Sequence, residues 1–434
     1  MNDHPVLARV ATAGVRLGLT RLRRFLAWMG NPHQRYPVIH VAGTNGKGSV
    51  CRIVGAMLEA HGLRVGITTS PHLQDVNERI RIGGRPIEDA DLDSLLLRIE
   101  RAWTAWAAAE LPPDEVLPLT WFELSIAAAF VHFADRSVDI AVVEVGMGGR
   151  LDATNVVDPI VTAIVTIGLD HLDVLGPDHA TIAAEKAGII KHGVPVVVGP
   201  LRHDALAVVR AIAAEREAPI SLLGHDFDAS GSSADFGYRS AGVSREGLLL
   251  GLQGDHQVTN AAVALRVVEL LPGGLRPSEP AIRAGLRLAR NRGRLEWLAE
   301  DLLVDGAHNM DGAGVLAGYL AQRPRPVVDG TSRPRVLLLG AGGDKDVRTV
   351  ILALAPVVDR IVTTQCSHVR ARDPVALAEA VRDVVGPDFD VTVGRSIAQT
   401  LPEVRAEVQA VGGELVVAGS LYLVGAVRDL VGVK

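Results

Sequence analysis

Cysteine is scarce in this chain, with only Cys51 and Cys366 among 434 residues. They lie far apart in the sequence, so we predict no disulfide framework and expect a reducing, cytoplasmic compartment. Surplus basic charge is also missing, because the formal net charge is -6. This argues against a general nucleic-acid-binding protein, which needs basic surface. Long apolar runs are absent both as a signal core and as a bilayer span, so we expect no membrane association.

Apolar residues are plentiful, at 48%, and charged residues make up 22% of the chain. This composition is typical of a globular protein. A chain of 434 residues is too long for one ordinary core, so we predict two or three domains. We place the main boundary within residues 297–301, because a new series of alternating strands and helices follows it.

The most informative segment is residues 38–49, VIHVAGTNGKGS. A β-branched apolar run ends in glycines and an apolar-periodic run follows over 50–60, which predicts strand, loop and helix. Backbone N–H groups at such a helix start bind phosphate, and Lys47 can reach a terminal phosphate. Val41 replaces the first glycine of the standard P-loop, and Gly48 separates the lysine from the hydroxyl residue. We predict a nucleotide triphosphate site, with a tight lysine-containing turn as the alternative.

Polar side chains end or follow three further predicted strands. The carboxyl ends of parallel strands meet at one sheet edge, where ligands bind. A carboxylate at the end of a buried strand needs a partner, and Mg²⁺ is the obvious one in a nucleotide protein. A helix cap is the alternative for the serine, and a core or surface position for the histidine. The strands and side chains are 64–68 with Ser70, 138–145 with Glu144, and 160–167 with His171.

Periodicity and turn residues predict the remaining elements. Lys186 falls on a helix, where a surface position is the ordinary expectation. Helices are expected over 6–29, 91–110, 117–134 and from 256 to about 271, a loop and hairpin over 75–84, an antiparallel excursion over 224–254, and strands at 194–198, 302–304, 336–339, 361–363, 390–393 and 414–418. The second half thus reads as a smaller α/β unit without a phosphate loop.

Taken in order, the motifs of this chain resemble the folylpolyglutamate synthase and dihydrofolate synthase family of the Mur ligase superfamily. The resemblance departs at Arg292 and Met310, where the family commonly has proline. The matching segments are 30–32, 40–49, 69–73, 77–80, 144–155, 168–172, 185–188, 254–260, 305–309, 343–346 and 419–422.

The resemblance implies an α/β fold of two domains. Residues 1–297 would form an N-terminal P-loop, Mur-ligase-like ATPase domain with a mostly parallel sheet and pterin-binding elements. Residues 298–434 would form a smaller C-terminal α/β, Rossmann-like glutamate-ligase domain. The implied reaction is ATP-dependent: a pterin-bearing carboxylate is phosphorylated, and the amine of L-glutamate attacks the acyl phosphate.

Roles carry over to matching positions. Lys47, Lys186 and His308 would be catalytic, and Lys186 would be N6-carboxylated to help hold the second of two Mg²⁺ ions. ATP would contact Gly46, Lys47, Gly48, Ser49, Asn260, Arg294 and Asp305. The metal would be coordinated by Ser70, Glu144, His171 and Lys186. The pterin would contact Leu17, Thr20 and Phe122.

The expected partners are small molecules: ATP, L-glutamate, and dihydropteroate or a reduced folate. The family also suggests a monomer. Three alternatives remain at this stage: polyglutamylation alone, a Mur-type ligase for another acid, and a nucleotide-binding regulator without catalysis. A complete two-metal set argues against the last, because binding alone does not require it.

Overall fold

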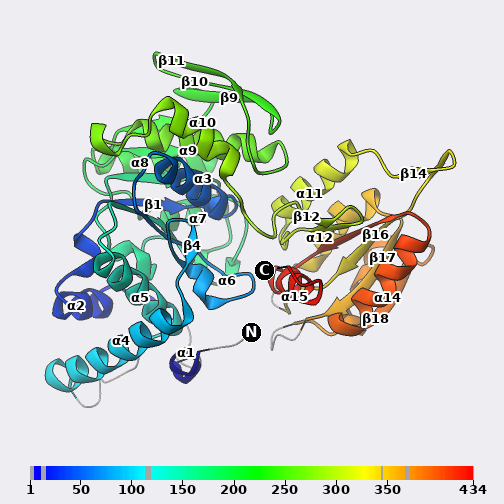
Figure 1. The fold of residues 1–434 in the computed structure, drawn as a ribbon, viewed down its shortest axis with the longest axis horizontal. Helices are drawn as coiled ribbons and strands as arrows, with labels where there is room; N and C mark the ends of the chain where they lie inside the picture. The colour runs from blue at the N-terminus through cyan, green and yellow to red at the C-terminus, as the bar shows by residue number, and fades with distance from the viewer. Residues whose placement is uncertain (1–3, 11–15, 113–118, 344–345, 367–370, 434) are drawn as a thin grey trace. The chain divides into compact units, whose positions relative to one another are not determined.

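The structure is a computed structural model, and it describes residues 4–10, 16–112, 119–343, 346–366 and 371–433. The chain divides into two compact units (Figure 1). Unit 1 comprises Met1–Gly251 and Gln257–Arg290, and unit 2 comprises Leu252–His256 and Asn291–Lys434. Each contains one large, mostly parallel sheet, which confirms the predicted α/β class. Among the described residues, no helix has the length and apolar character needed to cross a membrane.

The sheet of unit 1 has eight strands in the order β4-β3-β2-β5-β1-β6-β7-β8. The six strands from β2 to β8 in this order run parallel, and β3 and β4 form an antiparallel edge. Their apolar, β-branched sequences suit burial on both faces. The strands are β1 (Val38–Ala42), β2 (Val65–Thr68), β3 (Ile80–Ile82), β4 (Arg85–Pro86), β5 (Ile140–Glu144), β6 (Val161–Ile164), β7 (Val196–Val198) and β8 (Ile220–Leu222).

Helices cover both faces of this sheet. A side chain added at Gly66 of β2 would strike Phe133 of α5, whereas the neighbouring Ile67 fills the space beside Gly55 of α3. Successive strand residues point to opposite faces, so α3 and α5 lie on opposite sides. The helices of this unit are α1 (Pro5–Val10), α2 (Thr20–Trp28), α3 (Lys47–Ala60), α4 (Asp89–Glu110), α5 (Trp121–Asp135), α6 (Leu172–Leu175), α7 (His179–Ala187), α8 (His203–Glu215), α9 (His256–Glu269) and α10 (Glu279–Leu288).

Two predicted helices differ from the structure. The single helix expected over 6–29 is wrong, because α1 and α2 are separate and residues 16–18 between them are not helical. Gly18, with φ +133°, takes a backbone conformation that a helix cannot accommodate. The helix expected over 117–134 begins instead at Trp121, with Thr120 as its N-cap. Residues 117–118 and 344–345 lie outside the described residues.

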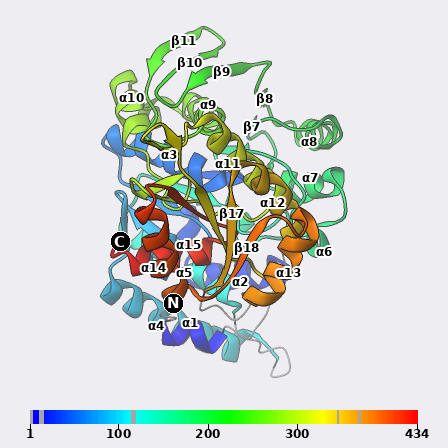
Figure 2. The ribbon, with the colours of Figure 1, turned by 90° about the vertical axis from the view of Figure 1, so that its right-hand side faces the viewer.

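The predicted antiparallel excursion is confirmed. It forms a three-stranded sheet of β9 (Phe227–Ser232), β10 (Asp235–Ser240) and β11 (Val243–Leu248), which lies beside α9 and α10 in both views (Figures 1 and 2). Glu269 of α9 fastens it by accepting hydrogen bonds from Tyr238 at 2.8 Å and Arg245 at 2.6 Å.

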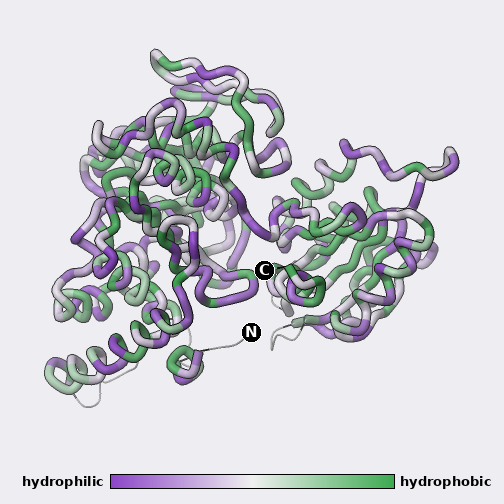
Figure 3. Tube along the Cα trace, in the orientation of Figure 1, coloured by the Kyte–Doolittle hydropathy of each residue, from purple (hydrophilic) through white to green (hydrophobic). Residues whose placement is uncertain are grey.

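Unit 2 has a six-stranded sheet in the order β12-β13-β19-β16-β17-β18, parallel except for the edge strand β12. The hydropathy tube in Figure 3 is green along its central strands. Its strands are β12 (Glu296–Ala299), β13 (Leu302–Val304), β16 (Arg335–Leu339), β17 (Arg360–Gln365), β18 (Asp390–Ser396) and β19 (Glu414–Ala418), with a small hairpin of β14 (Val327–Val328) and β15 (Thr331–Ser332). Its helices are α11 (Met310–Gln322), α12 (Val347–Leu354), α13 (Pro374–Val385), α14 (Ile397–Ala410) and α15 (Leu421–Leu430).

Candidate active site

The glycine loop between β1 and α3 has the predicted strand-loop-helix geometry. Gly46 is the N-cap of α3 and has φ +83°, a conformation that glycine adopts without strain. A Cβ at this position would lie 2.5 Å from Oδ1 of Asn260 and 2.8 Å from Cγ1 of Val165. The loop therefore packs directly against α9. Gly48 and Ser49 occupy the first turn of α3, and the N-terminal turn of a helix is a position that favours an anion.

Hydroxyl groups fix the glycine loop to the loop after β6. The N–H of Thr44 donates to the carbonyl of Thr166 at 2.9 Å, and the N–H of Asn45 donates to the hydroxyl of Thr166 at 2.9 Å. In return, the Thr44 hydroxyl accepts from the N–H of Gly168 at 2.9 Å. The two strand-end loops thus form one connected rim.

Two lysines meet at one carbonyl oxygen of this rim. Nζ of Lys47 and Nζ of Lys186 each lie 3.0 Å from the oxygen of Gly43. Lys186 is buried, so the surface position expected for it is wrong. Burial, and then the positive charge of Lys47, lower the pKa of Lys186 to about 7. This lysine consequently has a large neutral fraction near neutral pH.

Three of the predicted metal residues lie at or after the carboxyl ends of parallel strands. Glu144 ends β5 and is buried, and its Oε2 accepts the N–H of Ser70, which follows β2, at 3.0 Å. His171 follows β6, the strand on the other side of β1. It has φ +54° and an exposed side chain, and its N–H donates to Asp170 at 2.9 Å. Four neighbouring strand ends, those of β2, β5, β1 and β6, therefore supply the rim.

Among the described residues, no three His, Cys, Asp or Glu side chains are already gathered into a metal-binding group. The structure brings Ser70 and Glu144 together directly. It places His171 on the loop whose Asp170 interacts electrostatically with Lys186. The metal roles of these residues remain predictions.

The residues expected to contact a pterin lie on two elements of unit 1. Leu17 is exposed just before α2, and Thr20 begins that helix. Phe122 lies in the first turn of α5 and packs over Gly146, where a Cβ would come within 2.3 Å of the ring. The phenyl ring is thereby held against the loop that follows Glu144.

The remaining predicted residues cluster in unit 2. Asp305 follows β13 and is buried, and it accepts the N–H groups of Leu295 and Ala307, both at 2.7 Å. Burial raises the pKa of this carboxyl, while the charges of Arg294 and His308 oppose the shift. Nδ1 of His308 lies 2.8 Å from the carbonyl oxygen of Gly306. Arg294, Asp305 and His308 are thus electrostatic neighbours within one unit.

Sequence reasoning missed several residues that shape the rim. Thr44 and Thr166 are the hydroxyl pair described above. Asp152 is buried and accepts the N–H of Met147 at 2.8 Å, which shapes the loop after β5. Arg52 of α3 donates to the hydroxyl of Thr69 at 3.2 Å. A signal was present for Asp152 and Thr44, because both fall within the matching motifs.

Comparison with known proteins now gives this geometry a family. Residues 119–268 match the Mur ligase middle domain, and residues 295–430 match the C-terminal domain of dihydrofolate synthetase. The dihydrofolate synthase/folylpolyglutamate synthase of Mycobacterium tuberculosis is 37% identical over 95% of this chain and 90% of its own length.

Solved structures agree. A Mycobacterium tuberculosis folylpolyglutamate synthase complexed with ADP and AMPPCP has a TM-score of 0.87 and 36% identity, covering 96% of both chains. A bifunctional folylpolyglutamate synthase/dihydrofolate synthase with Mn, AMPPNP and L-glutamate bound has a TM-score of 0.82 and 30% identity, covering 99% of this chain and 98% of its own.

The chain combines a P-loop at the carboxyl end of a central parallel strand with a second α/β unit, as in the Mur ligase architecture. This combination defines an ATP-dependent ligase. Within that class, the chain belongs to the dihydrofolate synthase/folylpolyglutamate synthase family.

Proposed function

We propose that this chain adds L-glutamate to dihydropteroate, to reduced folates, or to both, by forming an acyl phosphate with ATP. The observation that carries the proposal is the rim in unit 1, where the Lys47 loop and the Glu144 strand end share one edge of one sheet. Relatives with these activities in their names match nearly the whole chain.

The phosphates of ATP would bind at Gly46, Gly48 and Ser49, where the first turn of α3 offers N–H groups. Lys47 now donates to the carbonyls of Gly43 and Thr44, at 3.0 and 3.2 Å. It would exchange these neutral acceptors for phosphate oxygens, which form stronger charge-assisted bonds.

A divalent metal fits the chemistry of the donor set. Glu144 is a buried carboxylate at a strand end, and Ser70 and His171 stand on the neighbouring loops. Bound Mg²⁺ would neutralise the charge that develops on the transferred phosphoryl group. The oxygens of the rim suit this hard cation.

Lys186 would enter the set as N6-carboxylysine. A protonated lysine would repel a metal, whereas the carbamate is an oxygen ligand. The low pKa of Lys186, about 7, supports this step because only the neutral amine reacts with CO₂.

The residues of unit 2 would serve the nucleotide and the amino acid. Asn260, Arg294 and Asp305 would each contact the nucleotide, and the N–H groups of Leu295 and Ala307 fix the Asp305 carboxylate. His308 would act on the glutamate or acyl-phosphate side. We propose an ATP-binding domain at residues 1–297, with Leu17, Thr20 and Phe122 at the pterin, and a glutamate-ligase domain at 298–434. Arg294 lies before this proposed boundary but within unit 2, which includes Asn291–Lys434. We further propose a cytoplasmic monomer.

The experiment measures ADP release from ATP and Mg²⁺ with dihydropteroate or tetrahydrofolate, with and without L-glutamate. We expect glutamate-dependent turnover on at least one of the two acids, with the product one glutamate heavier by mass spectrometry. The ratio of the two rates distinguishes a bifunctional enzyme from one restricted to polyglutamylation. Absence of glutamate-dependent turnover on both acids refutes the proposal.

A further inference from the structure

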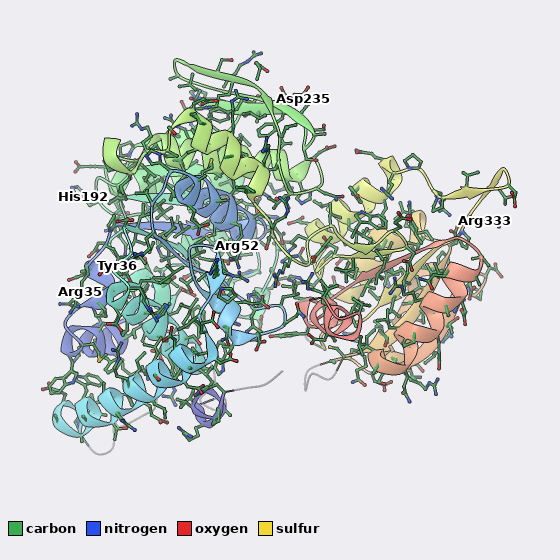
Figure 4. The ribbon with its side chains drawn as sticks, viewed as in Figure 1. Arg35, Tyr36, Arg52, His192, Asp235 and Arg333 are labelled. Atoms are coloured by element: carbon green, nitrogen blue, oxygen red, sulfur yellow. The ribbon has the colours of Figure 1, made fainter. Side chains whose placement is uncertain are left out.

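Arg52 is a partly buried arginine in the second turn of α3, the helix that begins at the phosphate loop. It comes three residues after Ser49, so the two side chains share one face of the helix. Figure 4 labels Arg52 near the middle of unit 1. None of the roles assigned above uses this side chain.

The guanidinium of Arg52 reaches the segment that carries Ser70. Its Nη2 donates to Oγ1 of Thr69 at 3.2 Å, and Thr69 is itself buried between the end of β2 and Ser70. The next residue donates its N–H to Glu144. A continuous path therefore runs from α3 through Thr69 and Ser70 to the Glu144 carboxylate.

Three carboxylates interact electrostatically with Arg52: first Glu144, then Glu78 and Glu59. Burial lowers the pKa of Arg52, and these negative charges oppose that shift. Glu78 accepts the N–H groups of residues 73, 74 and 75 and so shapes the loop beyond Ser70. Arg81 also lies near Glu59 and Glu78, so the charge of Arg52 matters most for Glu144, the acid whose charge affects Arg52 most.

We propose that Arg52 is a positioning residue for the metal site: it ties Thr69 and Ser70 to α3 and holds the Glu144 carboxylate beside them. The inference rests on the proposed metal roles of Ser70 and Glu144. An outer partner of this kind orients the groups that touch the metal without touching it.

Two effects of removing Arg52 oppose each other. Loss of a nearby positive charge would favour cation binding, whereas loss of the bond to Thr69 would let the Ser70 segment move away from Glu144. The first effect acts through space and is weakened by solvent and protein relaxation. We expect the second to dominate, because the bond from Arg52 is a direct contact with Thr69, the residue next to Ser70, and both residues lie beyond the paired part of β2.

The test measures metal binding directly. Mn²⁺ is titrated into the complex of the full chain with ADP, and free Mn²⁺ is followed by electron paramagnetic resonance. Arg52→Gln should weaken Mn²⁺ binding by about tenfold or more. The affinity for ADP without metal should remain within about twofold of the parent protein, since the P-loop itself is unchanged.

Matched variants separate positioning from folding. Arg98→Gln removes an exposed arginine that pairs with Asp135, and it should leave Mn²⁺ binding unchanged. Thr69→Val keeps the arginine but removes its acceptor, so it should weaken Mn²⁺ binding in the same direction even if Arg52→Gln folds poorly. Arg52→Lys keeps the charge without the planar fork and should restore binding only in part.

Each outcome decides the question. Equal Mn²⁺ binding in Arg52→Gln and the parent, or tighter binding in Arg52→Gln, overturns the positioning role while the proposed function stands. If the parent complex shows no ADP-dependent Mn²⁺ binding and no glutamate-dependent turnover, the proposed function itself fails. In a Glu144→Gln background, the Arg52 substitution should cause little further loss, because the group it positions is gone.

Discussion

The buried amine of Lys186 gives the sharpest quantitative prediction. An ordinary lysine, with pKa 10.5, is only about 0.1% neutral at pH 7.5. With the pKa of Lys186 lowered to about 7, roughly three quarters of the amine is neutral at that pH. Burial thus increases the reactive form by nearly three orders of magnitude, before any metal is bound. Carboxylation should therefore favour this side chain over an ordinary lysine.

The reaction itself is balanced and simple. The neutral amine attacks CO₂, a C–N bond forms, and one amine proton leaves to solvent, which gives a carbamate and H⁺. Because protonated amine cannot attack, the carbamate should decrease as the pH falls through about 7. The same sign holds for folding: below about 7 the native state must bury a charged lysine, so the free energy of unfolding contributed by this residue rises with pH between about 7 and 10.5.

The assay is ¹³C NMR of the protein in ¹³C-bicarbonate at a series of pH values. We expect one labelled carbamate per chain, lost in Lys186→Met. Lys191→Met is the matched control, because Lys191 also has a lowered pKa but donates to the carbonyl of Asn155 instead of Gly43. A signal that persists in Lys186→Met, or is lost only in Lys191→Met, refutes the reasoning. So does a parent protein without any carbamate between pH 7 and 9.

Three further predictions concern unit 1. Glu144→Gln should lower kcat by at least about a hundredfold with an unchanged Tm, because it removes a proposed metal ligand without changing core volume; near-normal kcat would exclude that role. Gly46→Ala should weaken ADP binding by about tenfold in calorimetry, because the φ of +83° and the tight surroundings of Gly46 disfavour a side chain. Gly62 has a similar φ but open space around it, so Gly62→Ala should leave ADP binding unchanged. Arg21→Ala should destabilise the protein by about 3 kcal/mol, seen as a lower Tm, because the buried carboxylate of Glu123 loses its ion-pair partner. Arg9→Ala breaks the more exposed pair with Glu100 and should leave Tm unchanged. Equal Tm values for the two variants would contradict this reasoning.

The position of the site at the ends of parallel strands could be predicted from the sequence, because it depends on local sequence patterns. A β-branched run followed by glycines, or by an isolated carboxylate, specifies a parallel strand and its functional end without knowledge of the whole fold. That the carboxyl ends of such strands lie on one side of the sheet follows from the α/β class, whereas the order β2-β5-β1-β6 is known from the structure. The prediction of Glu144 and Ser70 at the same edge rests on this rule, and they are in direct contact.

The burial of Lys186 could not be predicted in this way, because it depends on close contact between two segments, one with Gly149 and one with Gly188. Gly149 and Gly188 lack the Cβ atoms that would otherwise collide with the backbone near Lys186 and with Arg150. The end of α7 can therefore approach the loop after β5 closely. The sequence next to Lys186, with Glu185 before it and Ala187 after it, does not indicate this approach. The break between α1 and α2 was missed for a related reason, since apolar spacing continues across it.

The glycine loop owes its shape to bonds that do not involve the nucleotide. Thr166 holds the backbone of Thr44 and Asn45 from one side, and Gly168 donates to the Thr44 hydroxyl from the other. Less binding energy is therefore needed to order the loop, while Lys47 would exchange its carbonyl partners for a phosphate. Thr166→Val should expose this arrangement: it removes the hydroxyl but keeps the side-chain volume, so ADP affinity should fall while Tm changes little. An unchanged affinity would mean that the strand ends alone are sufficient to shape the loop.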